Sequence, residues 1–153
     1  AELNYNDVTT LGTVEVSKTV TATAAGLVNH VDYQVQRPYF LDIAETVNAI
    51  GGTGGGTQDI DITAGNVVPE TVDTSENTFT FSDPSATGRS CSFTLILTNG
   101  GSQTVNWPAS VDWAGGTEPT LTSSGIDIFT FTTVDAGTIW YGFAAGIDMK
   151  TPS

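Results

Sequence analysis

Two carboxylates, Asp59 and Asp61, lie on either side of Ile60 in a segment where polar and apolar residues alternate. Both would lie on one face of a β-strand, roughly 6.5–7 Å apart. That spacing suits half of a Ca²⁺ site or the acid pair of a hydrolase. The polar residues 73–77 could add oxygens, but they are typical of an ordinary turn. We therefore expect a solvated strand face, with no metal ligand and no catalytic residue.

The sequence also lacks the motifs of a nucleophilic enzyme and of a phosphate-binding loop. His30 is the single histidine, and no Gly-x-Ser-x-Gly motif supplies an activated serine. The glycine-rich run 51–56 lacks the Gly-Lys-Ser/Thr that holds phosphate in nucleotide-binding loops. Cys91, the one cysteine, lies in a segment where apolar and polar residues alternate, and we expect it to be a small core residue. The sequence thus predicts no enzyme and no cofactor.

Aromatic residues are the remaining candidates for binding. Trp107, Trp113 and Trp140, with Tyr141 and Phe143, could stack on sugars or bases. Aromatics at strand spacing more often fill a core, which is the interpretation that we favour.

A second aromatic group lies further upstream, where Arg37 precedes Tyr39 and Phe40. Arginine and tyrosine commonly anchor protein interfaces, so we predict Arg37, Tyr39 and Phe40 as interface residues, with an intramolecular contact as the alternative.

The charge balance narrows the partners. The 153 residues hold 4 Lys and Arg against 17 Asp and Glu, a formal charge of −13, and charged residues make up only 14% of the chain. Nucleic acids and anionic lipids need basic residues to neutralise phosphate, so neither is an expected partner. No basic segment precedes an apolar run, and no apolar run approaches the length of a membrane span, so we expect neither a signal peptide nor a transmembrane helix.

The elements that must position these residues are predominantly strands. Alternation of apolar and polar residues predicts strands over 13–23, 27–37, 58–63, 67–72, 78–81, 91–98, 102–107, 111–113, 126–133 and 138–145. Asn99-Gly100 predicts a hairpin between 91–98 and 102–107. A second hairpin is expected around Asp135-Ala136-Gly137. The fold class is therefore all-β, and we predict an antiparallel, jelly-roll-like β-sandwich preceded by a strand-rich segment.

The glycine run sets the expected domain organisation. We predict an N-terminal attachment segment over 1–50, a glycine-rich linker over 51–57 and a β-sandwich module over 58–153. Residues 39–50 fit either a short helix or an extended arm. Acidic residues are more frequent before residue 77 than after it, so a basic or cation-bridged partner is expected to contact the N-terminal part.

Residues 79–146 resemble a module of tailed-bacteriophage virion proteins, found in tail fibres and other exposed virion components. The resemblance is carried by 77–84, 92–97, 103–121, 126–133 and 139–142. Its most specific part is the order Trp107-Pro108-Ala109-Ser110, Trp113, Gly115-Gly116-Thr117 and Pro119-Thr120-Leu121. The resemblance implies a virion component and brings no catalytic residues.

These observations together predict a non-enzymatic structural protein of a phage virion, assembled in the host cytoplasm. We favour a capsid decoration (cement) protein that bridges capsomers as a homotrimer and contacts the major capsid protein or another virion protein. The alternative is a tail-fibre or tail-tip subunit that binds a host surface glycan. A metal-dependent hydrolase based on Asp59 and Asp61, and a secreted adhesion domain, are the other classes left open.

Overall fold

The computed structural model describes residues 39, 41–53 and 55–152, and the chain divides into two compact units, Ala1–Asp42 and Ile43–Ser153. The expected strands 13–23 and 27–37 lie outside the described residues. Within the described part, the strands are β1 (Gly51–Thr53), β2 (Gly56–Asp61), β3 (Val67–Val72), β4 (Asn77–Ser82), β5 (Cys91–Thr98), β6 (Val105–Asn106), β7 (Val111–Trp113), β8 (Ile126–Thr133) and β9 (Trp140–Gly146). The described residues form no α-helix, and the two short 3-10 turns are η1 (Gly100–Ser102) and η2 (Ala114–Gly116). The all-β prediction is confirmed.

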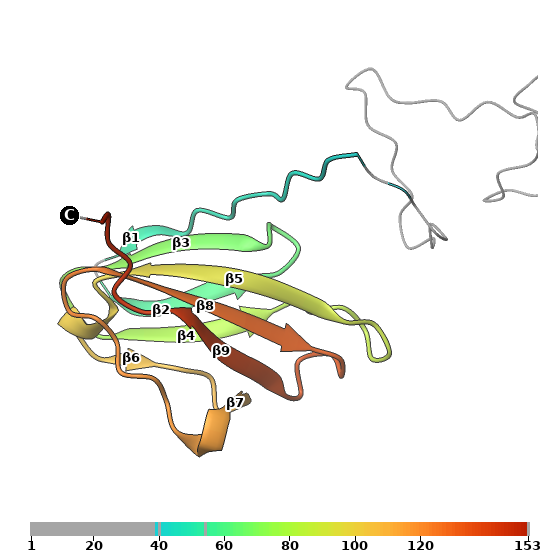
Figure 1. Cartoon of the computed structure of the whole chain (residues 1–153). Coiled ribbons are helices and arrows are strands. Elements are labelled where there is room, and N and C mark those ends of the chain that lie inside the picture. Colours follow the sequence, from blue (N-terminus) through green and yellow to red (C-terminus); the bar gives the residue numbers. More distant parts are fainter. Residues whose placement is uncertain (1–38, 40, 54, 153) are drawn as a thin grey trace, which may run out of the picture. The chain divides into compact units, whose positions relative to one another are not determined.

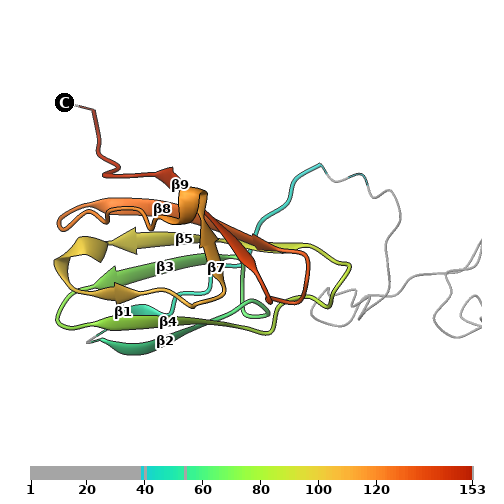
Figure 2. The same ribbon diagram turned by 90° about the horizontal axis from the view of Figure 1, so that it is seen from below.

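Two sheets make up the second unit. In the described residues, the larger sheet has the order β1-β3-β5-β8-β9-β7 and the smaller sheet the order β2-β4-β6. Figures 1 and 2 show the two sheets as facing layers. Buried residues from both, such as Ile60 and Phe79 of the smaller sheet and Leu95 and Phe129 of the larger, form one hydrophobic core.

Alternation along the strands explains which side chains fill this core. In β5, Phe93, Leu95 and Leu97 are buried, whereas the residues between them are more exposed. In β8, Phe129 and Phe131 are buried in the same way. The buried face of β5 is the one that the alternation in its sequence predicts, because a period of two in hydrophobicity matches the period of the pleat.

The expected antiparallel pairing is largely wrong. Five strand pairs of the described residues are parallel (β1–β3, β3–β5, β2–β4, β4–β6 and β7–β9), and β5–β8 and β8–β9 are antiparallel. From β1 to β6 the chain enters the larger and the smaller sheet alternately, so each strand pairs with the strand two places away. A jelly roll is built from antiparallel pairs, and this coil of alternating strands differs from it for that reason.

The two predicted hairpins have opposite outcomes. β8 and β9 pair antiparallel around the turn at Asp135-Ala136-Gly137, as expected. The Asn99-Gly100 hairpin is wrong, because β5 belongs to the larger sheet and β6 pairs with β4 in the smaller one. Asn99 does adopt the left-handed conformation (φ 57°, ψ 32°), but it leads into η1 and a crossing between sheets.

The predicted linker is also part of the sheets. Gly51–Thr53 form β1 and pair with Glu70–Val72 of β3, and Gly56 and Thr57 begin β2. The second unit begins at Ile43, before the predicted module boundary at residue 58. A parallel strand needs only backbone hydrogen bonds, which glycine supplies as well as any residue. The described residues of 39–50 form no helix, and Val47 makes a parallel bridge with Val67.

Buried polar groups fasten the loops to the core. The side chain of Asp127 in β8 is fully buried, and its two oxygens accept hydrogen bonds from the backbone N–H groups of Thr122 (2.7 Å) and Asp148 (2.9 Å). These bonds offset the cost of burying a carboxylate and hold the segments on both sides of the β8–β9 hairpin. No helix in the described part of the chain is long and apolar enough to cross a membrane.

Candidate functional site

Asp59 and Asp61 lie on the outer face of the smaller sheet, where hydroxyl groups surround them. The two oxygens of Asp59 accept hydrogen bonds from Thr80 Oγ1 and Ser82 Oγ of β4, both at 2.6 Å. Asp61 Oδ1 accepts from Thr63 Oγ1 (2.6 Å) and the Thr63 N–H (2.8 Å), which lowers the pKa of Asp61. The described residues contain no group of three or more His, Cys, Asp or Glu placed to hold a metal ion. The two carboxylates thus belong to a hydrogen-bonded strand face.

The other residues singled out in the sequence lie in different places. His30, Arg37 and Phe40 are outside the described residues, and Tyr39 is 95% exposed. Cys91 is half-buried against the core, as expected of a small core residue, and its Sγ accepts from the Ser85 N–H at 3.3 Å. These positions therefore assemble no common site.

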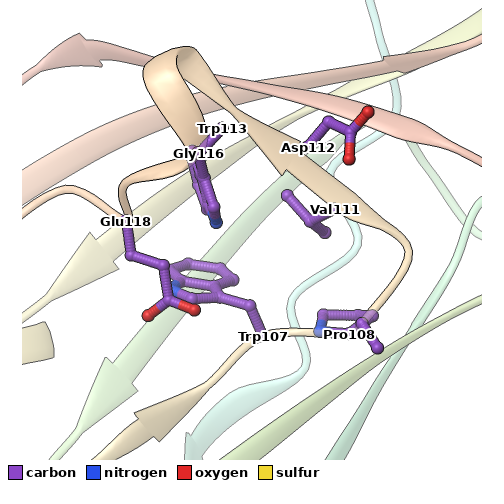
Figure 3. A pocket seen from close by; sticks show the side chains of 8 residues that line it. Trp107, Pro108, Val111, Asp112, Trp113, Gly116 and Glu118 are labelled. Carbon is purple, nitrogen blue, oxygen red and sulfur yellow. The ribbon is translucent and has the colours of Figure 1, made fainter.

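The three tryptophans separate into two environments. Trp140 is 1% exposed and belongs to the core, which confirms the core interpretation for this residue. Trp107 and Trp113 are half-buried, pack against the core and also line a cavity of about 520 Å³. Its other lining residues are Pro108, Ala109, Val111, Asp112, Gly116 and Glu118. We call this cavity the indole pocket (Figure 3).

One short stretch of chain builds the indole pocket. Trp107 follows β6, Val111 and Trp113 belong to β7, and Glu118 follows η2. Gly115 (φ 67°) and Gly116 (φ 69°) both adopt the left-handed conformation, which a side chain would disfavour. This double turn brings the chain back so that Glu118 reaches toward Trp107, as Figure 3 shows. The pocket coincides with the stretch 103–121 that carries the most specific part of the resemblance.

Aromatic packing fixes the two indoles. Trp107 stacks on Phe79 (centroids 5.4 Å apart, 18° between planes), and Trp113 meets Trp107 edge-on at 5.3 Å and 69°. The Nε1 of Trp113 is buried without a hydrogen-bond acceptor and points toward the Trp107 ring in Figure 3. This geometry suits an N–H···π contact, which stabilises the perpendicular arrangement. Aromatic neighbours therefore contact both indole walls.

The charged residues of the pocket are both acidic. Asp112 and Glu118 are exposed, and neither carboxylate has a hydrogen bond or ion pair within the described residues. Figure 3 shows the carboxylate of Glu118 beside Trp107, whereas that of Asp112 points away from the two indoles. Asp112 lies between Val111 and Trp113 on β7, so alternation directs it to the opposite face. Of the two carboxylates, that of Glu118 is therefore the one directed toward the indoles.

A second candidate surface is the outer face of the larger sheet. Cross-strand neighbours on it include Thr94 with Thr130 and Ile96 with Ile128, followed by Thr130 with Phe143 and Thr132 with Tyr141. Tyr141 and Phe143 are 43% and 55% exposed. We call this surface the uncharged face; on β3, β5, β8 and β9 it consists of Val67, Pro69, Thr71, Ser92, Thr94, Ile96, Thr98, Ile126, Ile128, Thr130, Thr132, Tyr141 and Phe143.

The two sheets thus differ in what they present to solvent. The acidic residues within β3 and β8, Glu70 and Asp127, are buried in the interior and add no charge to this face, whereas Asp112 of β7, opposite Tyr141, borders it at one edge. The outer face of the smaller sheet instead carries Asp59 and Asp61 among threonines and a serine. A broad surface of threonine, isoleucine and aromatic side chains on an acidic protein is typical of a protein contact.

Comparison with known proteins gives no assignment: no family model, no curated protein and no solved structure matches this chain.

Proposed function

We propose that this chain is a non-enzymatic structural protein of a phage virion, and within that class a capsid decoration protein. The resemblance of residues 79–146 to virion modules supports the class. The local hydrogen bonds that engage Asp59 and Asp61 also support a binding role. The β-sandwich module would then present its surfaces to neighbouring virion proteins.

The uncharged face is the observation that carries the proposal. A chain with a formal charge of −13 meets electrostatic repulsion when it binds an acidic surface, and the part of this face away from Asp112 offers contact without burying a charge. The uncharged face would add a second contact to that of residues 1–50, for which the sequence predicts an attachment role. The acidic face of the smaller sheet would remain in solvent, where a net charge keeps particles dispersed.

The size of the face bears on the oligomeric state. Four strands about 4.8 Å apart and about 20 Å long cover roughly 400 Å². This flat footprint is smaller than the contact of a standard stable interface, which buries ~800 Å² of accessible surface per partner. One copy would therefore attach weakly. A homotrimer on the capsid lattice would combine several such contacts and bridge neighbouring capsomers.

Electron microscopy of labelled particles tests this proposal. Antibodies against the purified full chain would be applied to phage particles from a lysate in which the gene is expressed. We expect gold label distributed over the head. Label restricted to the tail, or absence of the chain from purified particles by mass spectrometry, would overturn the assignment as a decoration protein.

The indole pocket favours a second candidate, a tail-fibre or tail-tip subunit that binds a host surface glycan. The cavity has aromatic and polar lining residues, and its volume lies within the usual range for small ligands. Tail label, together with retention of the chain on host surface polysaccharide, would support this candidate over the first.

A further inference from the structure

We infer that the indole pocket binds the guanidinium group of an arginine side chain on a protein partner. The inference rests on the proposed function for the nature of that partner, a neighbouring virion protein. It rests on the pocket alone for the chemistry of the ligand.

The charge of the pocket selects a cation. Glu118 is the carboxylate that reaches the indoles, and no basic residue lines the cavity. Of the basic residues in the described part, Lys150 pairs with Asp148 at 2.6 Å and Arg89 lies in the loop before β5. Glu118 is therefore left for a ligand from outside the described residues.

The aromatic walls favour a flat cation over a sugar ring. Phe79 stacks on Trp107, and the edge of Trp113 meets Trp107 from a second direction. Gly142 of β9 lies against Trp113, since a Cβ placed there would come within 2.7 Å of the indole. Neither indole thus offers the broad open platform on which a pyranose stacks. A guanidinium is thinner, can lie against the parts of Trp107 and Trp113 that line the cavity and can donate two parallel hydrogen bonds to a carboxylate.

The experiment uses the full chain and small probes of matched shape. The indole N–H signals of Trp107, Trp113 and Trp140 would be followed by NMR while acetyl-arginine amide is added, with acetyl-citrulline amide as its neutral counterpart. We expect the Trp107 and Trp113 signals to shift with a dissociation constant in the millimolar range and the Trp140 signal to remain in place. Acetyl-lysine amide should bind more weakly than the arginine probe, because an ammonium lacks the planar donor pair.

Two variants separate the local carboxylate from overall charge. Glu118→Gln should weaken arginine binding about tenfold, the change that corresponds to 1.4 kcal/mol. Asp112→Asn removes the same charge from the same pocket rim but points away from the indoles, so it should weaken binding less than about twofold at physiological salt. Equal losses in the two variants would reduce the effect to long-range attraction and overturn the inference.

Three further results would also overturn it. These are equal shifts with citrulline, tighter binding of the lysine probe, and tighter binding of neutral N-acetylglucosamine, which would make the pocket a sugar site. Unmoved Trp107 and Trp113 signals at saturating probe would show that the pocket takes no such ligand. None of these results affects whether gold label is found over the phage head. Failure of the pocket inference and failure of the proposed function can therefore be told apart.

Discussion

Phe131 in β8 connects the indole pocket to the rest of the core. Its ring stacks on Phe93 (centroids 4.9 Å apart) and lies 5.0 Å from Phe81, 5.7 Å from Trp107 and 5.6 Å from Trp113. Each such pair contributes roughly 0.5–1.5 kcal/mol beyond the burial of its surface. The walls of the pocket are therefore held by the same residue that fills the centre of the fold.

Replacing Phe131 by alanine should destabilise the protein by about 3–5 kcal/mol, because it leaves a cavity among four aromatic rings. The neighbouring Thr130→Ala, on the uncharged face, should change the free energy of unfolding by about 0.5 kcal/mol or less. Urea denaturation of both variants measures the difference. Similar losses in the two variants would contradict the assignment of inner and outer faces to β8.

Asp135 stabilises the turn between β8 and β9. Its Oδ1 accepts hydrogen bonds from the Ile139 N–H (3.1 Å) and from Thr133 Oγ1 (2.8 Å), and these bonds lower the pKa of Asp135. A carboxyl whose pKa is lower in the folded than in the unfolded state stabilises the fold fully above the unfolded value of about 3.9. That contribution is lost as the pH falls through the lower, folded pKa.

We therefore expect Asp135→Asn to lower the melting temperature at pH 7 by a few degrees. The difference from the unchanged protein should shrink when both are acidified below the folded pKa of Asp135. Thermal unfolding followed by circular dichroism between pH 7 and pH 2 provides the measurement. Asp73→Asn is the control, since no hydrogen bond to Asp73 is found among the described residues. A difference that persists at the lowest pH would mean that shape, and not charge, stabilises the turn.

At the scale of the element, the sequence predicts which face of a strand is buried better than it predicts which strands pair. Alternation alone places Phe93 and Leu95 inside, because the pleat requires it whatever the partner strand. It does not state which strand lies alongside, and the expected Asn99-Gly100 hairpin fails for that reason. The turn at Asp135-Ala136-Gly137 does close a hairpin because β8 and β9 stay in one sheet.

The sequence likewise predicts only part of the indole pocket. The sequence identifies Trp107 and Trp113 and the unusual order of residues around them, and it favours core positions for both. Whether an indole is covered depends on β7 pairing with β9, a long-range contact that no local pattern encodes. Glu118 was not predicted as a site residue, although the adjacent glycines Gly115 and Gly116 signal the sharp turn that positions it.

The contact between β7 and β9 depends on Gly142. A Cβ there would lie 2.7 Å from Cζ3 and 2.9 Å from Cε3 of Trp113, and a ring held by Trp107, Phe129 and Phe131 cannot easily move away. Gly142→Ala should cost about 1–3 kcal/mol of stability through overpacking and should shift the Trp113 indole N–H signal.

Ala144→Ser, an exposed substitution on the same strand, serves as the matched control and should leave both quantities nearly unchanged. Urea denaturation and NMR of the two variants give the measurements. A Gly142→Ala protein with unchanged stability and an unmoved Trp113 signal would refute the close packing of β7 on β9.

At the scale of the whole molecule, the proposed function assigns the uncharged face to binding and the acidic face of the smaller sheet to solvent. Phe143→Glu places a charge on the β9 edge of the uncharged face, at an exposed position, so the fold should lose about 1 kcal/mol or less. Attachment to virions should weaken at least tenfold, since the new carboxylate would be buried without a partner.

Thr57→Glu is the control, because it adds the same charge to the exposed outer face of the smaller sheet. Sedimentation of each full-chain variant with particles stripped of the protein measures attachment. Equal weakening by both substitutions would point to general repulsion between acidic surfaces and would remove the special role of the uncharged face.

The alternation of β1 to β6 between two sheets also has a consequence for synthesis on the ribosome. β5 pairs with β3, which emerges earlier, but its other neighbour is β8, which emerges much later. Until residues 126–133 leave the exit tunnel, one edge of β5 has no partner strand and Phe93 and Leu95 lack their cover from β8. Open edges of this kind recruit other chains into aggregates. The hairpin of β8 and β9 therefore covers the open edge of β5 in the growing chain. Chains truncated before residue 126 should accumulate as insoluble material.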